Sequence, residues 1–301
     1  MDSTTAHINI IGGGRLGRSL AKLWHSHNAA RIAAVCNRSL QSATEATTFI
    51  GAGQPCSALE QLKPAPLWLI ATADSDIENT AQQLAETGTL RRGDIVFHCS
   101  GSLSSKCLGT FEATGAYTAS VHPIHSFADP DKTQTSFAGT YCAIEGSQEA
   151  LDQLQPLFQT IGAITFSLRS SEHKALYHSA TVMACNYLVT LQDCALHLLQ
   201  QAGIERNQGL ELLAPIVRQT ADNVTRQDTT TALTGPIARG DSSTIAQHLQ
   251  AIQQQAPDLL ILYSQLGLHT LPIAAQQGSA NSDQLRNIEK QLKAATDNEK
   301  P

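Results

Sequence analysis

The first part of the chain alternates short apolar runs with amphipathic stretches. Apolar runs of three to five residues predict strands at 8–11, 32–36, 67–71, 95–99, 119–121, 141–144 and 164–166. Between them, segments such as 16–25 and 77–86 have the apolar spacing of helices. Strands that are apolar throughout, rather than alternating, are typical of a parallel sheet with helices on both faces.

After residue 168 the strand signals stop. The segment 173–201 is apolar almost all round, which predicts a central buried helix, and 208–223, 243–255 and 258–275 predict shorter helices. The segment 279–301 is polar and charged, which predicts a surface helix that frays. We therefore predict two domains, a sheet domain at 1–168 and an all-helical domain at 169–301, which agrees with a length of 301 residues.

Composition narrows the class of protein. The chain has 20 Lys and Arg against 26 Asp and Glu, a net charge of −6, which disfavours binding to nucleic acid or to an anionic membrane. We see no N-terminal leader, and we expect no apolar run of the ~18 residues that cross a bilayer. The seven cysteines lack the spacing of a metal site, so we expect reduced thiols, no metal and a cytoplasmic protein.

A glycine loop follows the first predicted strand and has the G-x-G-x-x-G pattern. In such loops the first glycine permits a tight turn, the second lets a pyrophosphate approach the backbone, and the third lets the next helix pack closely. The helix start offers free N–H groups to phosphates. The pattern predicts an N-terminal Rossmann dinucleotide-binding domain, followed by the all-α C-terminal domain. The predicted cofactor residues are Gly12, Gly13, Gly14, Arg15, Leu16 and Gly17.

The residues at the end of the second predicted strand favour NADP over NAD. A protein that binds NAD usually carries Asp or Glu about 20 residues beyond the last glycine, where it accepts a hydrogen bond from the ribose. Here Asn37, Arg38 and Ser39 stand at that place, and a cation with neutral polar groups suits a 2′-phosphate. Thr72 and Ala73, after the third predicted strand, are expected beneath the cofactor ribose. We expect Asp74 and Asp76, which follow, to cap the next helix.

Four segments carry candidate chemistry. Ser100, Gly101 and Ser102 leave a predicted strand with hydroxyl and N–H donors that suit a substrate carboxylate. His122 and His125 flank Pro123, which fixes the backbone, and histidine exchanges protons near neutral pH.

The third segment begins the long apolar helix. Lys174 and His178 share one helical stripe, and a lysine in a buried helix needs a polar cleft. The positive end of the helix dipole disfavours its charge, so Lys174 is a candidate general acid. Asn186 lies off that stripe. In the loop 234–241, Arg239 suits bidentate capture of a carboxylate, or else pairs with Asp241.

These motifs together resemble the Rossmann-like family with a C-terminal domain of unknown function. They are the loop 12–17, the runs 98–101 and 122–127, the set Lys174, His178 and Asn186, and the loop 234–241. The family is related to the ketopantoate, pyrroline-5-carboxylate and beta-hydroxyacid reductases. The resemblance implies a helical domain that dimerises. It also implies that Lys174 matches a catalytic lysine, although His178 replaces the asparagine expected four residues later. His122 and Pro123 also resemble the His-Pro of prephenate dehydrogenases, but Ser126 and Phe127 stand where a glycine is expected.

We therefore predict an NADP(H)-dependent oxidoreductase that reduces a small 2-oxo acid, in the manner of a ketopantoate reductase. Lys174, His178 and His122 would move the proton. The carboxylate substrate would be bound by Ser100, Gly101, Ser102, His125, Asn186 and Arg239. The alternatives are an enzyme like prephenate dehydrogenase, an imino-acid reductase and a regulatory protein that binds NADP without catalysis. A homodimer through the helical domain is the expected assembly.

Overall fold

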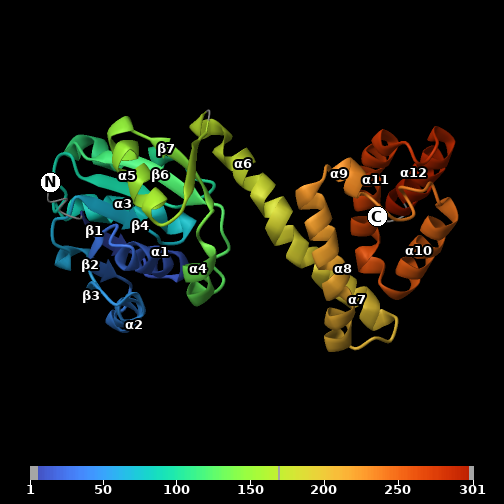
Figure 1. Cartoon of the computed structure of the whole chain (residues 1–301), viewed down its shortest axis with the longest axis horizontal. Helices are drawn as coiled ribbons and strands as arrows, with labels where there is room; N and C mark the ends of the chain where they lie inside the picture. The colour runs from blue at the N-terminus through green and yellow to red at the C-terminus, as the bar shows by residue number, and fades with distance from the viewer. Residues whose placement is uncertain (1–5, 169, 298–301) are drawn as a thin grey trace. The chain divides into compact units, whose positions relative to one another are not determined.

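The computed structural model describes residues 6–168 and 170–297, which form two compact units, Met1–Ala184 and Cys185–Pro301 (Figure 1). The division falls inside a helical run, Ser171–Gln201, so the first turns of this run belong to the sheet unit. Residue 169, at the predicted domain boundary, and residues 298–301, at the end of the last predicted helix, lie outside the described residues.

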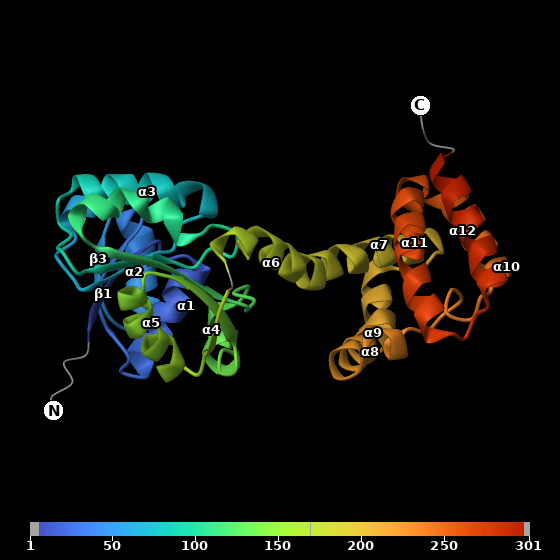
Figure 2. The same ribbon diagram turned by 90° about the horizontal axis from the view of Figure 1, so that it is seen from above.

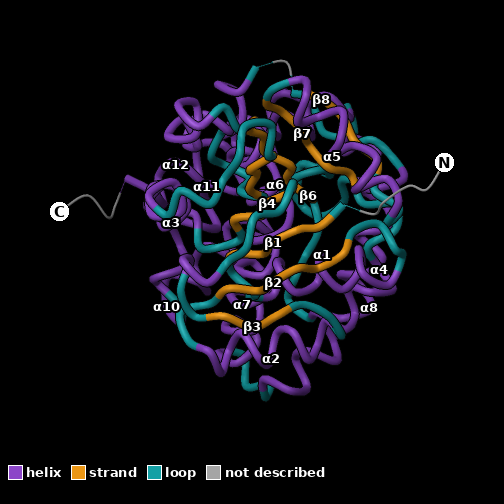
Figure 3. The backbone as a smooth tube through the Cα atoms, turned by 90° about the vertical axis from the view of Figure 1, so that its left-hand side faces the viewer, coloured by secondary structure: helices purple, strands orange, loops and turns teal. Residues whose placement is uncertain are grey.

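The first unit is built on one sheet of eight strands in the order β3-β2-β1-β4-β5-β6-β7-β8 (Figure 3). Neighbouring strands are parallel except β6 and β7, which are antiparallel. Each of the seven predicted strands is present. The sequence pattern misses β3, since three residues that include a proline give no recognisable period. The strands are β1 (His7–Ile11), β2 (Arg31–Cys36), β3 (Gln54–Cys56), β4 (Leu67–Ile70), β5 (Ile95–His98), β6 (Tyr117–Pro123), β7 (Tyr141–Gly146) and β8 (Ile164–Ser167).

Helices cover both faces of this sheet, as predicted (Figure 2). On one face, Trp24, Phe97 and Phe158 meet edge to face at 5.4–6.3 Å between ring centroids. That face carries α1 (Arg15–Ser26), α2 (Leu40–Ile50), α4 (Pro130–Ser136) and α5 (Gln148–Thr160). The other carries η1 (Leu59–Gln61), α3 (Asp74–Glu86) and η2 (Ser105–Thr114). Because β1, β4 and β5 are parallel neighbours, their carboxyl ends bring loops to one edge of the sheet.

The unit ends with η3 (Ser171–His173) and α6 (Lys174–Thr181), and a π-helical turn (Val182–Asn186) follows. The second unit packs its helices around a core of Ile245, Leu249, Ile252, Leu260, Ile288 and Leu292. These helices are α7 (Tyr187–Gln201), α8 (Arg206–Arg226), α9 (Thr229–Ala232), α10 (Ser242–Gln255), η5 (Pro257–Leu259), α11 (Leu260–Gln277) and α12 (Ser282–Asp297). The helix expected at the end of the chain is present as α12, and Leu285, Ile288 and Leu292 place one of its faces in the core.

The long helical run is not buried within the single chain, which corrects the prediction of a central buried helix. Leu176 is 72% exposed and Val189 is 71% exposed. Ser171–Gln201 is also a helix that is long enough and apolar enough to cross a membrane, by length and composition only. This corrects the expectation that no such segment exists. This is a weak indication of a membrane span, because core helices pass the same test. An all-round apolar pattern predicts that a helix is covered, but not what covers it.

Candidate functional site

A cleft of about 1160 Å³ lies at the carboxyl ends of β1, β2 and β4, against the glycine loop. Eight of the eleven predicted cofactor residues line it: Gly12, Gly13, Gly14, Arg15, Asn37, Arg38, Thr72 and Ala73. The other three serve the loop indirectly. Leu16 packs on the core, Gly17 lies under the loop, and Ser39 begins α2 by accepting the N–H of Ser42 at 3.3 Å.

The three motif glycines differ in what surrounds them. Gly12 has a φ of +98°, and a Cβ there would lie 2.5 Å from the carbonyl oxygen of Ala71. A Cβ on Gly17 would overlap the carbonyl oxygen of Gly12, so this glycine lets α1 pack against the loop. A Cβ on Gly14 would meet nothing within 4 Å. The backbone at Gly14 therefore faces open space, as close approach of a pyrophosphate requires.

The polar groups around this loop fit an anionic dinucleotide. Gly14 is the N-cap of α1, and among the described residues no side chain caps this helix and no acid stands in its first turn. The N–H groups there remain available to phosphate oxygens. Asn37 holds the loop through a hydrogen bond of 2.6 Å from the Gly13 N–H to its Oδ1. The Thr72 hydroxyl, on the cleft wall, is buried without a hydrogen-bond partner within the described structure.

The cleft also contains a cation that the sequence prediction missed. Arg18 lines it together with Arg15 and Arg38, and its guanidinium carbon lies 5.4 Å from the centre of the Phe49 ring. Its position three residues after Arg15 places both on one face of α1, and that spacing is the signal that could have found it.

The loop after β5 is organised around Asp74, which the sequence assigned to helix capping. The Ser100 hydroxyl donates to Asp74 Oδ2 at 2.6 Å, and the Ser102 hydroxyl donates to the same oxygen at 3.0 Å. The Ser100 oxygen accepts the N–H groups of Ser102 at 3.2 Å and of Leu103 at 3.0 Å. Asp74 forms no side-chain cap on α3. The hydroxyl and N–H donors of Ser100 and Ser102 are therefore used within the chain, whereas the N–H of Gly101 has no hydrogen bond among the described residues.

His98 supports this loop from inside the sheet. Its side chain is fully buried, and its Nδ1 accepts the Ser100 N–H at 3.1 Å. Because a backbone N–H only donates, the neutral ring carries its proton on Nε2, which faces the Ser104 carbonyl at 3.3 Å and the Cys107 sulfur at 3.5 Å. Burial lowers the pKa of His98 to about 4. The sulfur of Cys107 therefore faces an N–H donor rather than a base.

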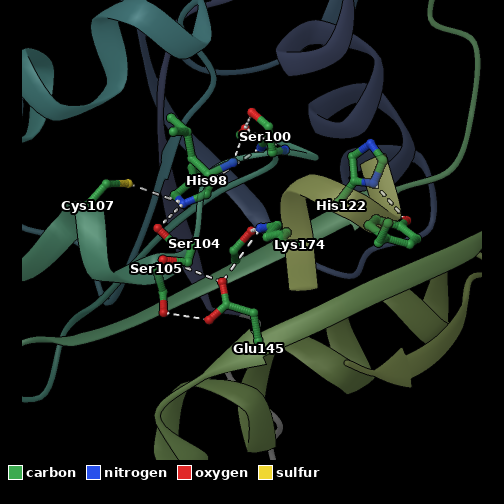
Figure 4. A network of polar contacts seen from close by, with 12 residues as sticks. His98, Ser100, Ser104, Ser105, Cys107, His122, Glu145 and Lys174 are labelled. Carbon is green, nitrogen blue, oxygen red and sulfur yellow. Dashed lines mark hydrogen bonds and ion pairs between the residues drawn. The ribbon is translucent and has the colours of Figure 1, made fainter. Parts of the chain in front are cut away.

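Lys174 lies in a buried polar network rather than at an open cleft (Figure 4). Its side chain is 1% exposed, and its ammonium donates to the Ser120 hydroxyl and lies 3.6 Å from Glu145 Oε1. Glu145 also accepts the N–H of Ser105 at 2.7 Å and its hydroxyl at 2.8 Å. Burial lowers the pKa of Lys174, and Glu145 opposes that shift. The network fastens α6 to β6 and β7, and the general-acid role of Lys174 stays a prediction.

His122 and His178 meet beside Gly101. The two rings lie 5.4 Å apart between centroids, and His122 Nδ1 hydrogen bonds to the Tyr177 hydroxyl at 2.9 Å. A Cβ on Gly101 would overlap His178 and lie 2.8 Å from His122 Nε2, so only glycine fits beneath the rings. Burial, then His178 and Lys174, lower the pKa of His122 to about 4. Burial raises the pKa of Tyr177 to about 12, so its phenol stays neutral.

Comparison with known proteins places this arrangement in a family. A Rossmann-like domain matches residues 1–123, and the domain of unknown function DUF2520 matches residues 140–270. The chain is a Rossmann-like protein with a DUF2520 domain. No curated protein matches the sequence.

Solved structures share the fold over most of this DUF2520 chain. A protein from Bacteroides fragilis, described as a candidate NADP oxidoreductase, is 24% identical with a TM-score of 0.75, over 89% of this chain and 98% of that one. Protein TM1727 from Thermotoga maritima is 22% identical with a TM-score of 0.68, over 90% and 99%. An imine reductase from Myxococcus stipitatus, in complex with NADP⁺, is 15% identical with a TM-score of 0.55, over 97% and 95%.

The remaining predicted substrate residues do not join His122 and His178 in the described contacts. The His125 ring packs against Phe127 and Phe137 and lies 3.3 Å from the hydroxyls of Ser136 and Thr140. Asn186 and Arg239 belong to the second unit, and both are exposed.

The alternative ion pair of Arg239 with Asp241 is not formed among the described residues. Asp241 instead caps α10, where it accepts the Thr244 N–H at 3.0 Å and hydroxyl at 2.6 Å. These bonds lower the pKa of Asp241.

Besides Arg18, Tyr177 and Glu145 are site residues that the sequence did not predict. Glu145 comes directly after a predicted apolar strand, and a charged residue at a strand's carboxyl end was the available signal. Tyr177 lies between Lys174 and His178 in the predicted helix, but only the folded chain shows that it reaches His122.

Proposed function

We propose that the protein is an NADP(H)-dependent oxidoreductase. The observation that carries this proposal is the cleft of about 1160 Å³ at the glycine loop, with open space at Gly14 and uncapped N–H groups at the start of α1. The fold shared with an imine reductase that binds NADP⁺ supports it. When bound, the cofactor would supply or accept a hydride, and the glycine loop would hold its pyrophosphate.

NADP is favoured over NAD because Asn37, Arg38 and Ser39, and no carboxylate, follow the end of β2. Arg38, Arg18 and Asn37 all line the cleft there. Guanidinium groups recognise phosphates through paired N–H donors. A fluorescence titration of the full chain with NADPH and NADH tests this directly. Equal or tighter binding of NADH would contradict the preference.

The reaction that this site supports is hydride transfer to a polar double bond of a small molecule. His122 is the group that we place nearest the reacting atoms, with His178 beside it and Tyr177 holding its Nδ1. Lys174 positions these residues by fastening α6 to the sheet. A small 2-oxo acid, as a ketopantoate reductase takes, is the substrate predicted from the sequence. Arg239 belongs to the second unit and is exposed, and its role as the carboxylate-binding residue stays a prediction.

A panel of oxo acids, hydroxy acids and cyclic imines, followed by NADPH absorbance, tests the activity. Turnover of one class, with loss of turnover in His122→Ala but unchanged NADPH affinity, supports the assignment. NADPH binding without turnover of any class would favour the regulatory alternative, because the same fold serves proteins without catalysis.

We also propose that the protein is a homodimer through its apolar helices. The helical run Ser171–Gln201 and α8 expose large apolar side chains that a soluble monomer rarely leaves open. They are Leu176, Met183, Tyr187, Leu188, Val189, Leu210, Leu212, Ile216 and Val224. Sedimentation should give the mass of two chains, and Val189→Glu should give one. A monomeric wild type, or a chain extracted only with detergent, would overturn this proposal.

We propose a cytoplasmic location, which the free thiol state of the seven described cysteines supports.

A further inference from the structure

His122 and His178 each keep one ring nitrogen without a partner. His122 Nδ1 is bonded to the Tyr177 hydroxyl at 2.9 Å, and His178 Nδ1 lies 3.4 Å from the Thr181 hydroxyl oxygen. Neither Nε2 has a hydrogen-bond partner among the described residues. Both rings are half-buried and meet edge to face beside Gly101, and we call this place the histidine corner. Two ring nitrogens of the corner are therefore available to a ligand.

The hydroxyl of Tyr177 determines where His122 carries its hydrogen. This hydroxyl has no second hydrogen bond in the described part of the chain, so its hydrogen finds an acceptor only if the phenol donates to His122 Nδ1. The ring hydrogen of His122 is then on Nε2. Burial, and then the charges of His178 and Lys174, lower the pKa of His122 to about 4. His122 is therefore a neutral hydrogen-bond donor at neutral pH, and it is not the source of a proton.

Thr181 determines the arrangement on His178. The Thr181 hydroxyl donates its one hydrogen to the His178 carbonyl at 2.8 Å. Its oxygen can therefore only accept a hydrogen bond from His178 Nδ1, which carries a hydrogen in the neutral and in the charged ring. The proton that His178 gains or loses is the one on Nε2. Because the charge of His178 disfavours a charge on His122, the pair takes up its first proton on His178.

A short chain of contacts connects the histidine corner with the cofactor cleft. Ala73 lines the cleft, and Asp74, the next residue, accepts the Ser100 hydroxyl at 2.6 Å. Gly101 follows Ser100 and packs against both histidine rings. Gly101 is buried, and its N–H has no hydrogen bond among the residues that the structure describes. A buried N–H without a partner is costly, so this amide is a further donor that an acceptor atom of a ligand would satisfy.

We infer that the histidine corner binds the oxygen of a carbonyl substrate: His122 donates a hydrogen bond to this oxygen from Nε2, His178 protonates it from Nε2, and Tyr177 is a positioning residue that keeps His122 in its donor form. The inference rests on the proposed oxidoreductase function and names its substrate class, a ketone or an aldehyde. It assigns to His178 the proton transfer for which the sequence also offers Lys174. Lys174 is buried and bound to other side chains, whereas His178 Nε2 is free.

The step balances with one proton from His178. The hydride that NADPH supplies forms a C–H bond at the carbonyl carbon, while the electron pair of the C=O π bond moves to oxygen. The oxygen takes the proton from Nε2 of charged His178, and the electron pair of that N–H bond stays on the nitrogen. The products are an alcohol, NADP⁺ and neutral His178, which solvent then recharges. His122 stays neutral and donates its hydrogen bond throughout.

Two pairs of variants in the full chain test these roles. His178→Gln keeps an N–H donor but cannot supply a proton, and its control is His173→Gln, an exposed histidine without a described side-chain partner. Tyr177→Phe removes only the hydroxyl. Its control is Tyr141→Phe, because Tyr141 also contacts the Phe166 ring but its hydroxyl has no hydrogen bond among the described residues.

Nitrogen-15 spectra of the histidine rings give a readout that needs no turnover, with signals assigned by their loss in His122→Gln and His178→Gln. Between about pH 5 and 8, where histidine usually changes charge, His122 should stay neutral with its hydrogen on Nε2, and charge should appear on His178 first. Tyr177→Phe should give a mixture of both His122 tautomers, and Tyr141→Phe should change nothing. A hydrogen on His122 Nδ1 in the wild type, or charging of His122 before His178, would overturn the inference.

Kinetics with NADPH test the proton transfer, with the oxo acid 2-oxopantoate and the cyclic imine 2-methyl-1-pyrroline as probes. His178→Gln should lose roughly 10²-fold or more in kcat for the oxo acid. Tyr177→Phe should lose roughly tenfold or less, as expected for one neutral hydrogen bond. Both should bind NADPH within about twofold of the wild type, and both controls should behave like the wild type.

The pH profile separates proton transfer from a structural role. The wild-type rate should fall as the pH rises through the neutral range, because only charged His178 donates a proton. This dependence should disappear in His178→Gln and remain in Tyr177→Phe. The other charged groups around the pair, Lys174 with Glu145 and Asp74, are the same in His178→Gln, so a slope lost in that variant belongs to His178. A slope that persists in His178→Gln would overturn the inference.

Failure of the proposed function gives a different result. If NADPH binds and the rings behave as expected but neither probe is reduced, the reductase assignment falls and takes the catalytic role of His178 with it. If only the imine is reduced, and His178→Gln reduces it like the wild type, the reductase assignment stands and the carbonyl inference falls.

Discussion

Replacing two glycines of the loop by alanine separates cofactor binding from folding. A Cβ at Gly14 meets nothing within 4 Å, whereas a Cβ at Gly17 overlaps the Gly12 carbonyl oxygen. The Gly14 backbone has a φ of −67°, which alanine adopts without strain. Gly14→Ala should therefore spare the apoprotein, and Gly17→Ala should damage it.

The expected magnitudes follow from these surroundings. In Gly14→Ala the smaller entropy of the unfolded chain stabilises by about 0.4–1 kcal/mol, and alanine at an N-cap loses a comparable amount. Stability should thus change by less than about 1 kcal/mol. The new methyl group occupies the space that a pyrophosphate needs, and losing one charge-assisted hydrogen bond costs about 1.5–3 kcal/mol. NADPH should then bind roughly 10–150-fold more weakly. Gly17→Ala should lose about 1–3 kcal/mol of stability through overpacking.

Two measurements on each variant decide the matter. Urea unfolding of the apoprotein gives stability, and calorimetric titration gives the dissociation constant for NADPH. If Gly14→Ala binds NADPH within about twofold of the wild type, the pyrophosphate does not approach this backbone and the assignment of the cleft is wrong. If Gly17→Ala unfolds at the wild-type urea concentration, the close packing of α1 under Gly12 does not matter for folding.

Three further substitutions test other parts of the site. Arg38→Asp should weaken NADPH roughly tenfold or more and favour NADH in paired titrations, and unchanged NADPH affinity would remove Arg38 from cofactor recognition. His98 has a folded pKa of about 4, below its unfolded value, so the unfolded state takes up a proton first as the pH falls. His98 alone should therefore lower stability by about 3 kcal/mol between about pH 7 and about pH 4, and His122, whose pKa is also about 4, adds to the same slope. His98→Gln should reduce that slope in urea unfolding without abolishing it; an unchanged slope would contradict the buried neutral ring. Lys174→Met leaves Glu145 buried without its cation and should cost about 3 kcal/mol, much of which Lys174→Met with Glu145→Gln should restore. If that stable double variant loses all turnover, Lys174 is the general acid that the sequence suggests rather than a positioning residue.

The parts of the structure that the sequence predicts well are those with local causes. The glycine loop is one, because Gly12, Gly14 and Gly17 act within six residues of chain. The seven strands are another, since each apolar run fixes its own burial. The sequence does not predict Arg18, because this residue lies outside the glycine motif. It does not predict β3, because that strand is too short to show a period.

The parts that could not be predicted depend on partners distant in sequence. From the sequence, Ser100 and Ser102 are predicted to be free hydrogen-bond donors. Only the fold brings Asp74, 26 residues from Ser100, into contact with them. The position of Lys174 in an apolar helix predicts that its side chain contacts polar groups, which it does. The polar environment it finds, however, is Glu145 and Ser120 inside the sheet. The sequence therefore indicates that Lys174 needs a polar partner, and the packing of the folded chain determines which residue that partner is.

The same reasoning explains how an acidic chain can bind an anionic cofactor. A net charge of −6 means that positive potential must be local, and Arg15, Arg18 and Arg38 supply it where they line the cleft. The same cleft is also lined by the acidic residues Glu45, Glu60, Asp76 and Glu86. The phosphates of an anionic cofactor are therefore favoured only beside the three arginines and at the uncapped start of α1, where the N–H groups are available.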